Sequence, residues 1–234
     1  MIAVLERDNA LAFDLLPIDS EALLQPIVGD QGPAGPFLLY EDVYDQIRTA
    51  RQADNPILPQ GIWETSLKRA DWDEVIGLAA NTLCHQSKDL QLAAWLVEAA
   101  VQRHGFAGLA EAVAITQTLA RTFWADLHPR IDAGDLAARL APIEWMCTKL
   151  PPTLRLVTLT QSGPNDDHVY CLADWDAARR ESEADDAVPM RTKIRAALQA
   201  SDLDWRQSTA RAVRDSLTQL QLLASCLDEQ CDGE

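Results

Sequence analysis

Apolar residues recur at helical spacing along most of the chain. Residues 41–51 carry apolar side chains on one face of a predicted helix, at Val43, Ile47 and Ala50. A second helix is predicted to start at Asp71, because Asp71 stands three residues before Glu74 as in a capping box. Its buried face follows at helical intervals, at Trp72, Val75, Ile76, Ala79 and Leu83.

The next stretch predicts two antiparallel helices. Residues 88–104 are apolar almost all round, which indicates a central buried helix, and Ser87 is placed to cap it. Gly105 stands where a left-handed helix end is required, so the chain is expected to turn back there. The returning helix, which Pro129 stops, has an apolar face at Leu109, Val113, Ala120 and Phe123.

Prolines punctuate the segment that follows. A helix is expected to start near Gly134 and to run toward Met146, with Pro142 either kinking it or opening a second short helix. Pro151 and Pro152 are expected to end that helix, because proline cannot donate the backbone hydrogen bond that the next turn requires.

The C-terminal third combines irregular and helical patterns. Residues 154–172 surround the turn-rich run 162–166, and they fit either a small hairpin or merely extended connections. Two helical patterns follow the acidic loop 181–189. The second carries a heptad-like stripe that is short for an independent coiled coil, so we expect it to pack on the domain rather than to self-associate. Its members are Ala210, Val213, Leu217, Leu220, Ala224 and Leu227.

These patterns predict an all-α fold: an antiparallel multi-helix bundle with irregular connections and a C-terminal helical hairpin. We expect residues 1–36 to form an N-terminal arm with a Gly/Pro-rich linker, and residues 37–160 to form the helical core. Residues 161–234 are expected to supply an irregular acidic connection and the hairpin, packed on the core as one domain.

Composition narrows the classes of partner. The 234 residues carry a formal net charge of −16, which disfavours nucleic acid and anionic membrane surfaces. No apolar run approaches the roughly 20 residues that a membrane span needs, so no membrane insertion is expected. The N-terminal stretch does not resemble a secretory signal, and the five cysteines are odd in number and scattered, which favours a reducing cytosol.

Five blocks between Glu41 and Arg130 carry a family resemblance. They are, in order, VYDQIRTAR, LPQGIWETSLKRADWDEVI, SKDLQLAAWLVEA, HGFAGL and FWADLHPR, with a weaker continuation in RLAPIEWMCTKLPPTLRLVTLT. With these blocks the chain resembles the N-terminal ImpA-type domain of TssA proteins of the bacterial type VI secretion system. The resemblance makes residues 37–160 the ImpA-type core.

The resemblance implies a non-enzymatic role. Proteins of that family are cytosolic assembly factors that engage the membrane complex and baseplate and help to polymerise the tail tube and sheath, without known catalytic residues or cofactor. We therefore expect a bacterial cytoplasmic protein whose partners are baseplate, sheath, tube or membrane-complex proteins. Ring formation is attributed to C-terminal regions of the family, so self-association is expected mainly through a region not present here, whether the chain is an N-terminal fragment or a short member.

Two alternatives belong to other functional classes. One is a generic helical adaptor unrelated to secretion. The other is a hydrolase that uses Asp126 and His128 as acid and base, with Arg130 as an anion clamp. A helix terminus explains the last pattern more simply, because His and Arg bond the final carbonyls of a helix. No metal or cofactor site is predicted, since no CxxC, HxxxH or HExxH spacing occurs.

Four residues, Trp95, Trp63, Leu217 and Leu220, are candidates for partner contact. Trp95 falls within the narrow polar stripe of the central helix, so something must cover it. The cover is expected from the N-terminal arm, from the loop around Trp63, or from a partner protein, since Trp is enriched at interface hot spots. Leu217 and Leu220 are the candidates from the heptad-like stripe.

Overall fold

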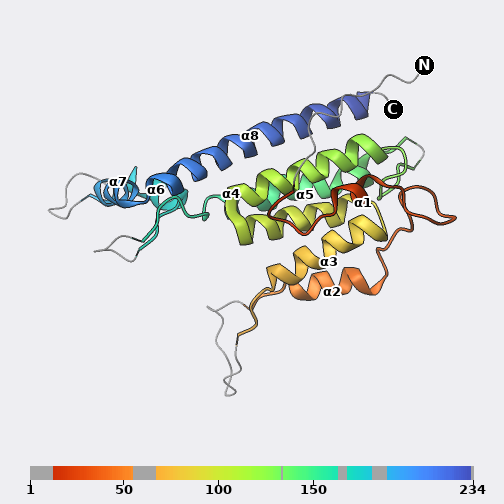
Figure 1. Ribbon diagram of the computed structural model, residues 1–234, viewed down its shortest axis with the longest axis horizontal. Helices are drawn as coiled ribbons and strands as arrows, with labels where there is room; N and C mark the ends of the chain where they lie inside the picture. Colours follow the sequence, from red (N-terminus) through yellow and green to blue (C-terminus); the bar gives the residue numbers. More distant parts are fainter. Residues whose placement is uncertain (1–12, 55–66, 133, 163–167, 181–188, 233–234) are drawn as a thin grey trace.

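Helices supply all of the regular structure in the described part of the chain (Figure 1). The computed structural model describes residues 13–54, 67–132, 134–162, 168–180 and 189–232, and within them the chain forms eight helices and no strand. The all-α prediction is confirmed. The elements are α1 (Ser20–Leu24), α2 (Asp42–Ala50), α3 (Trp72–His85), α4 (Leu90–Phe123), α5 (Ala137–Leu154), α6 (Leu172–Ala178), α7 (Met190–Ala200) and α8 (Leu203–Asp232).

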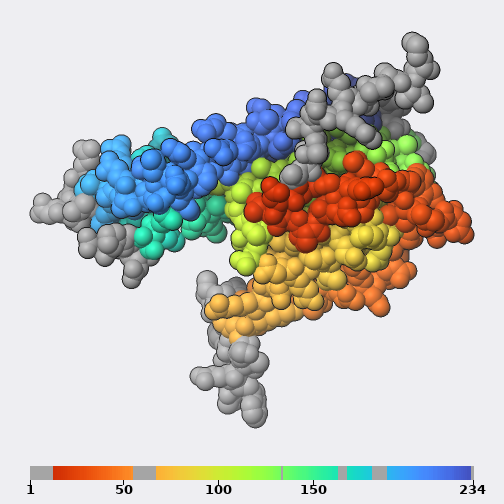
Figure 2. Space-filling view, viewed as in Figure 1, coloured from red at the N-terminus to blue at the C-terminus, as the bar shows by residue number. Residues whose placement is uncertain are grey.

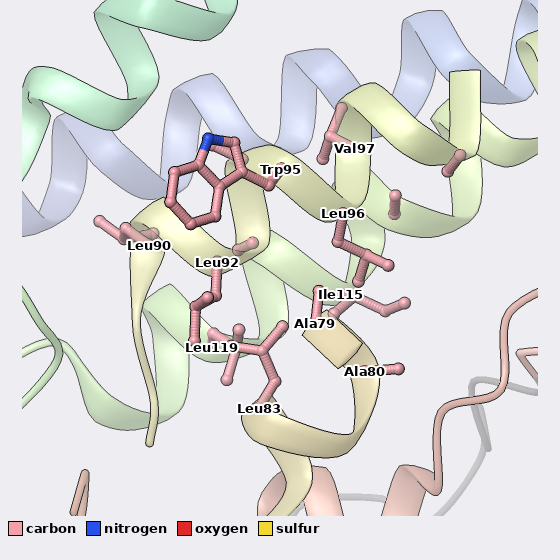
Figure 3. Close-up of a cluster of buried hydrophobic side chains, with 14 of the residues drawn as sticks. Ala79, Ala80, Leu83, Leu90, Leu92, Trp95, Leu96, Val97, Ile115 and Leu119 are labelled. Atoms are coloured by element: carbon pink, nitrogen blue, oxygen red, sulfur yellow. The ribbon is translucent and has the colours of Figure 1, made fainter. Parts of the chain in front are cut away.

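The hydrophobic core forms where α3 packs on the two arms of α4. The Asp71 carboxylate caps α3 by accepting the Glu74 N–H at 3.0 Å, as the capping-box pattern predicts. The α3 face that begins at Val75 is buried, which confirms the amphipathic reading. Figure 3 shows this face meeting both arms of α4, through Ala79, Ala80, Leu83, Leu92, Leu96, Ile115 and Leu119.

The bend in α4 depends on two glycines. Gly105 has φ +60° and ψ −136°, outside the helical region, and it divides α4 into residues 90–104 and 106–123. A side chain at Gly108 would overlap the carbonyl oxygen of Ala100, so the backbones of the two arms touch there. The predicted return of the chain after Gly105 is confirmed, and a side chain larger than hydrogen does not fit at the crossing.

Three prolines lie inside α5. The helix passes through Pro142 without interruption and continues to Leu154, so Pro151 and Pro152 occupy its last turns. The prediction that these two prolines end the helix earlier is wrong. An interior proline costs roughly 3 kcal/mol of helix stability, and packing on α4 through the buried side chains of Met146 and Leu150 opposes that cost.

The N-terminal arm is fastened to α4 from Phe13 onward. The Glu111 carboxylate of α4 accepts the backbone N–H groups of Asp14, Leu15 and Leu16, the shortest at 2.7 Å. The short helix α1 follows and packs on α3 and α4. Residues 1–12 of the predicted arm lie outside the described residues.

Connections rather than strands join α5 to α6. Thr158 and Cys171 form a single antiparallel bridge, and the Leu159 N–H donates to the Tyr170 carbonyl at 2.7 Å. In the described part of residues 154–172, the two flanks therefore pair antiparallel at one point without forming strands, and the choice between a hairpin and extended connections stays open. The segment 163–167 lies outside the described part.

The two C-terminal helices pack on different elements. α8 lies along α4 and buries Leu223, Cys226 and Leu227, and its Ser216 hydroxyl donates to the Phe106 carbonyl at 2.7 Å. α7 instead packs on α6 in a separate small cluster around Tyr170, Ala178, Ile194 and Ala197. In Figure 1 this cluster lies beside the first turns of α8, away from α3. The prediction that α7 and α8 form a hairpin packed on each other is therefore wrong. The apolar side of α8 packs on α4 instead.

A fully buried segment, residues 87–90, joins α3 to α4; we name it the junction. Ser87 does not cap α4, because the helix begins at Leu90 and its cap is Asp89, whose carboxylate accepts the Gln91 N–H at 2.7 Å. The Ser87 hydroxyl instead donates to the Pro36 carbonyl at 2.6 Å. The predicted cap is therefore wrong by two residues.

Lys88 of the junction caps the C-terminal ends of two helices, α1 and α3. Its ammonium donates to carbonyls in the last turns of α1 and α3, those of Ala22, Leu23, Leu83 and Cys84, at 2.9–3.4 Å. Carbonyls in the last turn of a helix generally lack the hydrogen bond that the next turn would supply, and a cation there also opposes the helix dipole. Burial lowers the pKa of Lys88 to about 8.

We predict that Gly108→Ala destabilises the protein and that Gly77→Ala does not. Overpacking at Gly108 is expected to lower the free energy of unfolding by about 1–3 kcal/mol. Gly77 lies in the middle of α3 with nothing near its Cβ position, so alanine there should raise that free energy by up to about 1 kcal/mol. Urea denaturation measures both. Equal effects would mean that the arms of α4 do not touch at Gly108.

We also predict a pH signature of Lys88. Because burial lowers its pKa from 10.5 to about 8, the unfolded chain binds more protons than the folded chain between those values. The contribution of Lys88 to the free energy of unfolding therefore rises with pH across that window. Denaturation of the protein and of Lys88→Met at several pH values isolates this group, and the difference should grow in favour of the unmodified protein. A constant or shrinking difference contradicts the lowered pKa.

Candidate interaction surfaces

Trp95 lies beneath α2. Its side chain is 5% exposed, and its ring meets the Tyr44 ring edge-on with 4.9 Å between centroids. The guanidinium carbons of Arg48 and Arg51 lie 5.9 and 5.2 Å from the Trp95 ring centroid. The cover therefore comes from α2, which belongs neither to the N-terminal arm nor to the loop around Trp63. Trp63 itself lies outside the described residues.

Arg51 links three helices through this cluster. Its guanidinium lies between the rings of Trp95 on α4 and Trp145 on α5, 5.1 Å from the latter. Its Nε donates to the Glu98 carboxylate at 2.5 Å, and both side chains are less than one-fifth exposed. This one cation thus makes cation–π contacts with two rings and a charge-assisted hydrogen bond with Glu98. Glu98 thus has a partner within the chain.

Tyr44 continues the contact inward to the junction. Its hydroxyl donates to the Asp89 carboxylate at 2.6 Å. Burial, followed by the charge of Asp89, raises the pKa of Tyr44, and burial raises the pKa of Asp89. The phenol therefore stays protonated and keeps donating. Because Asp89 also caps α4, this bond orients α2 against the start of the central helix.

Sequence reasoning missed the residues that cover Trp95. Tyr44, Arg48 and Arg51 recur at intervals of four and three, so they share one face of α2. A tyrosine and two arginines on one helix face can pack on an indole ring through aromatic and cation–π contacts. This pattern was the available sequence signal for the cover of Trp95. Nothing in the spacing showed which helix would pair with α2.

The DLHPR block contacts the loop between α1 and α2. His128 is 3% exposed, its ring stacks on Phe37 with 5.1 Å between centroids, and its Nε2 lies 2.9 Å from the Gly35 carbonyl. Arg130 donates to the Gln31 carbonyl at 2.8 Å. The expectation that His128 and Arg130 bond the last carbonyls of their own helix is therefore wrong.

The carbonyls just beyond the end of α4 are bonded by an arginine of α5. Arg139 of α5 is fully buried and donates to the carbonyls of Trp124, Leu127 and Pro129, which follow the end of α4. His128 also pairs with the junction, since its N–H donates to the Lys88 carbonyl at 3.0 Å and its carbonyl accepts the Leu90 N–H at 2.8 Å. Asp126 and His128 therefore lie in a segment that joins loops and helix ends.

Leu217 and Leu220 lie on the outside of α8, 56% and 37% exposed. The side of α8 that faces α4 differs from the heptad-like stripe. It carries Ser216 and Leu223, each one residue before a stripe position. Only Leu227 of the predicted stripe is buried, and Val213 is half-buried. The expectation that the whole stripe packs on the domain is therefore not met. Figure 2 shows α8 running along one edge of the molecular surface.

One cavity of about 570 Å³ lies where the bend of α4 meets the end of α5 and the first half of α8. Its lining includes His104, Thr153, Val157, Trp205 and Ser208. These side chains do not place a nucleophile beside an acid–base pair. In the described ranges, no three His, Cys, Asp or Glu side chains gather as a metal site. No helix described here is long and apolar enough to cross a membrane.

We predict that Trp95→Ala behaves as a core truncation. Loss of the ring removes the surface on which α2 packs, so the free energy of unfolding should fall by about 3–5 kcal/mol. Tyr40→Ala is the matched aromatic control: Tyr40 is 94% exposed, so its removal should change that free energy by less than about 0.5 kcal/mol. Denaturant titration compares the two variants. If Trp95→Ala is as stable as the control, the Trp95 ring does not hold α2 in the unmodified protein and is available to a partner.

Comparison with known proteins identifies the family. Residues 24–148 match the model of the family described as ImpA, N-terminal, type VI secretion system. No curated protein matches the chain. A similar solved structure is the N-terminal domain, including the conserved ImpA_N region, of the TssA component of the type VI secretion system from Burkholderia cenocepacia.

The likeness to that structure spans almost the entire chain. It covers 97% of this chain and 87% of the other, with 25% sequence identity and a TM-score of 0.74. The family match includes α2, α3, α4, the junction and the DLHPR segment, and it covers more than half of the chain. The chain therefore belongs to the family of ImpA N-terminal domains of the type VI secretion system.

Proposed function

We propose that this chain acts as a non-enzymatic assembly module of the type VI secretion system, in the bacterial cytoplasm, by binding baseplate, sheath, tube or membrane-complex proteins. The observation that carries the proposal is the family match over residues 24–148, supported by structural likeness along 97% of the chain. The mechanism is binding alone.

The geometry of the polar residues supports a binding role over the hydrolase alternative. His128 is buried and its ring stacks on Phe37, while its Nε2 faces the Gly35 carbonyl. A general base must reach a substrate proton at hydrogen-bond distance. The imidazole of His128 instead holds the loop between α1 and α2 against the end of α4.

That loop offers a surface for a partner within the family-matched stretch. Between residues 24 and 148, the exposed large apolar side chains of the described residues are Leu24, Val28, Phe37, Tyr40 and Leu67. Three of these five lie between α1 and α2, and Leu24 is the last residue of α1. Val28 is 99% exposed and Tyr40 is 94% exposed. Exposed tyrosine is enriched at interface hot spots, and its two side-chain torsions make it inexpensive to order.

Trp95 can contact a partner protein only if α2 moves away from its ring. A partner that reaches its ring has to displace α2, and with it the contacts of Tyr44 and Arg51. The loop between α1 and α2 requires no such rearrangement. We therefore favour Val28 and Tyr40 as the residues that meet a secretion partner.

We predict that affinity capture with this chain, from cells that express a type VI secretion system, recovers a baseplate, sheath, tube or membrane-complex protein. Val28→Ser with Tyr40→Ala should reduce that recovery at least about tenfold, the effect of losing 1.4 kcal/mol of binding free energy. Quantitative mass spectrometry measures the recovery.

The control for this experiment is Leu222→Ser, an exposed leucine on α8 outside the family-matched stretch. It should recover the same proteins as the unmodified chain. Absence of every secretion component from the capture counts against the secretion role and favours a generic helical adaptor. Unchanged recovery by the Val28 and Tyr40 variant moves the contact to another face.

A further inference from the structure

The outer face of α8 carries an apolar stripe that the described chain does not cover. Leu217 and Leu220 are 56% and 37% exposed, and Leu203 at the start of the same helix is 56% exposed. Alanines at positions 210 and 224 extend the stripe and are also exposed. Continuous apolar surface of this kind marks association sites in water-soluble proteins.

The same region of α8 lacks charge. Residues 216–227 contain no Asp, Glu, Lys or Arg, although 24% of the chain is charged and its net charge is −16. A solvent-facing helix normally alternates apolar and charged positions. In this chain the charged residues of α8 lie on either side of that run, within 204–215 and within 228–232.

These two segments carry net charges of opposite sign, because the first holds three arginines and two aspartates, whereas the second holds only acidic charged residues. Toward the N-terminal end, Arg206 and Arg214 lie on or beside the stripe, whereas Asp228 and Asp232 follow it at the C-terminal end. The Nε of Arg206 is buried and makes no hydrogen bond within the described residues. A surface that is basic at one end, apolar in the middle and acidic at the other complements its own copy when that copy runs in the opposite direction.

We propose that α8 is the interface of an antiparallel homodimer. Antiparallel heptads pair position a of one helix with position d of the other. Centred between Leu217 and Leu220, this register sets Leu217 against Leu220 of the second copy and Val213 against Ala224. Leu227, the last residue of the heptad-like stripe, is buried in the domain core and takes no part in the interface. The small side chain of Ala224 leaves room for close approach of the helices.

The charged ends meet in the same register. Arg206 comes level with residue 231 of the second copy, which Asp228 and Asp232 flank. A parallel arrangement would place the arginines of the two copies side by side and the aspartates likewise, which costs free energy in both places. The pattern of charge therefore selects the antiparallel direction.

In the proposed dimer, the α4-facing side of α8 stays packed on α4. The residues buried on that side are Ser216, Leu223, Cys226 and Leu227. Leu217 and Leu220 of the proposed stripe are exposed, and Leu217 lies roughly 100° round the helix from Ser216. Dimerisation thus does not require α8 to leave the domain. Because the stripe spans only three heptads, we expect a dissociation constant on the order of tens of micromolar.

The test is the mass of the complete 234-residue chain in solution, by light scattering or sedimentation from about 5 to 500 µM, a range that brackets this affinity. The protein should pass from monomer to dimer. Leu217→Lys with Leu220→Lys should weaken dimerisation at least about tenfold, because each dimer would bury four ammonium groups. These positions are exposed, so the fold is expected to survive, and circular dichroism verifies this.

The matched control is Leu222→Lys. Leu222 is 44% exposed on the same helix, but it points away from the stripe, so this change should leave the dimer intact. If Leu222→Lys weakens association as much as the change at Leu217 and Leu220, association is non-specific and the proposal is overturned.

Charge reversal tests the direction of the helices. Arg206→Glu with Arg214→Glu should weaken the dimer, and adding Asp228→Arg with Asp232→Arg should restore it, since the ends again carry opposite signs. A parallel dimer would gain nothing from the second pair of changes. A monomer at every concentration overturns the proposal, and cover by residues 1–12 or by a different protein would then explain the stripe.

Discussion

The burial of Lys88 and Asp89 between α3 and α4 is the constraint around which the domain is arranged. Two adjacent ionisable side chains without solvent contact need hydrogen-bond partners nearby, since an unpaired buried charge costs several kcal/mol. Lys88 finds its partners in the ends of α1 and α3, and Asp89 finds them in Tyr44 of α2 and the first turn of α4. Four helices are thereby fixed relative to one short segment.

The contacts around Trp95 extend this arrangement outward. Tyr44 contacts the indole ring with its own ring and Asp89 with its hydroxyl, so the same side chain serves both the core and the junction. Arg51 then joins the outer side of the cluster to α5 through Trp145. Polar groups in this region are directed inward, where they hold helices together, and the same is true of His128 and Arg139 in the segment after α4.

What remains available for other molecules lies elsewhere. The loop between α1 and α2 exposes Val28 and Tyr40 within the family-matched stretch, and the outer face of α8 exposes Leu217 and Leu220 beyond it. These are apolar surfaces on a strongly acidic protein, and they lie on opposite sides of the match boundary. One surface for a secretion partner and another for a second copy would let a single domain connect its own assembly to that of its partner.

The sequence by itself determined the main helices and much of the core, whereas it predicted neither α1 nor α6. Periodicity predicted α3, both arms of α4 and the bend at Gly105, because local spacing and glycine's freedom at positive φ are encoded within a few residues. The same spacing marked Trp95 as needing cover and Leu217 and Leu220 as a stripe. Only the tertiary structure decided which element covers which face. It placed α2 over Trp95, carried α5 through Pro151, and left the stripe of α8 outside, because such pairings depend on residues far apart in the chain whose complementarity no local pattern records.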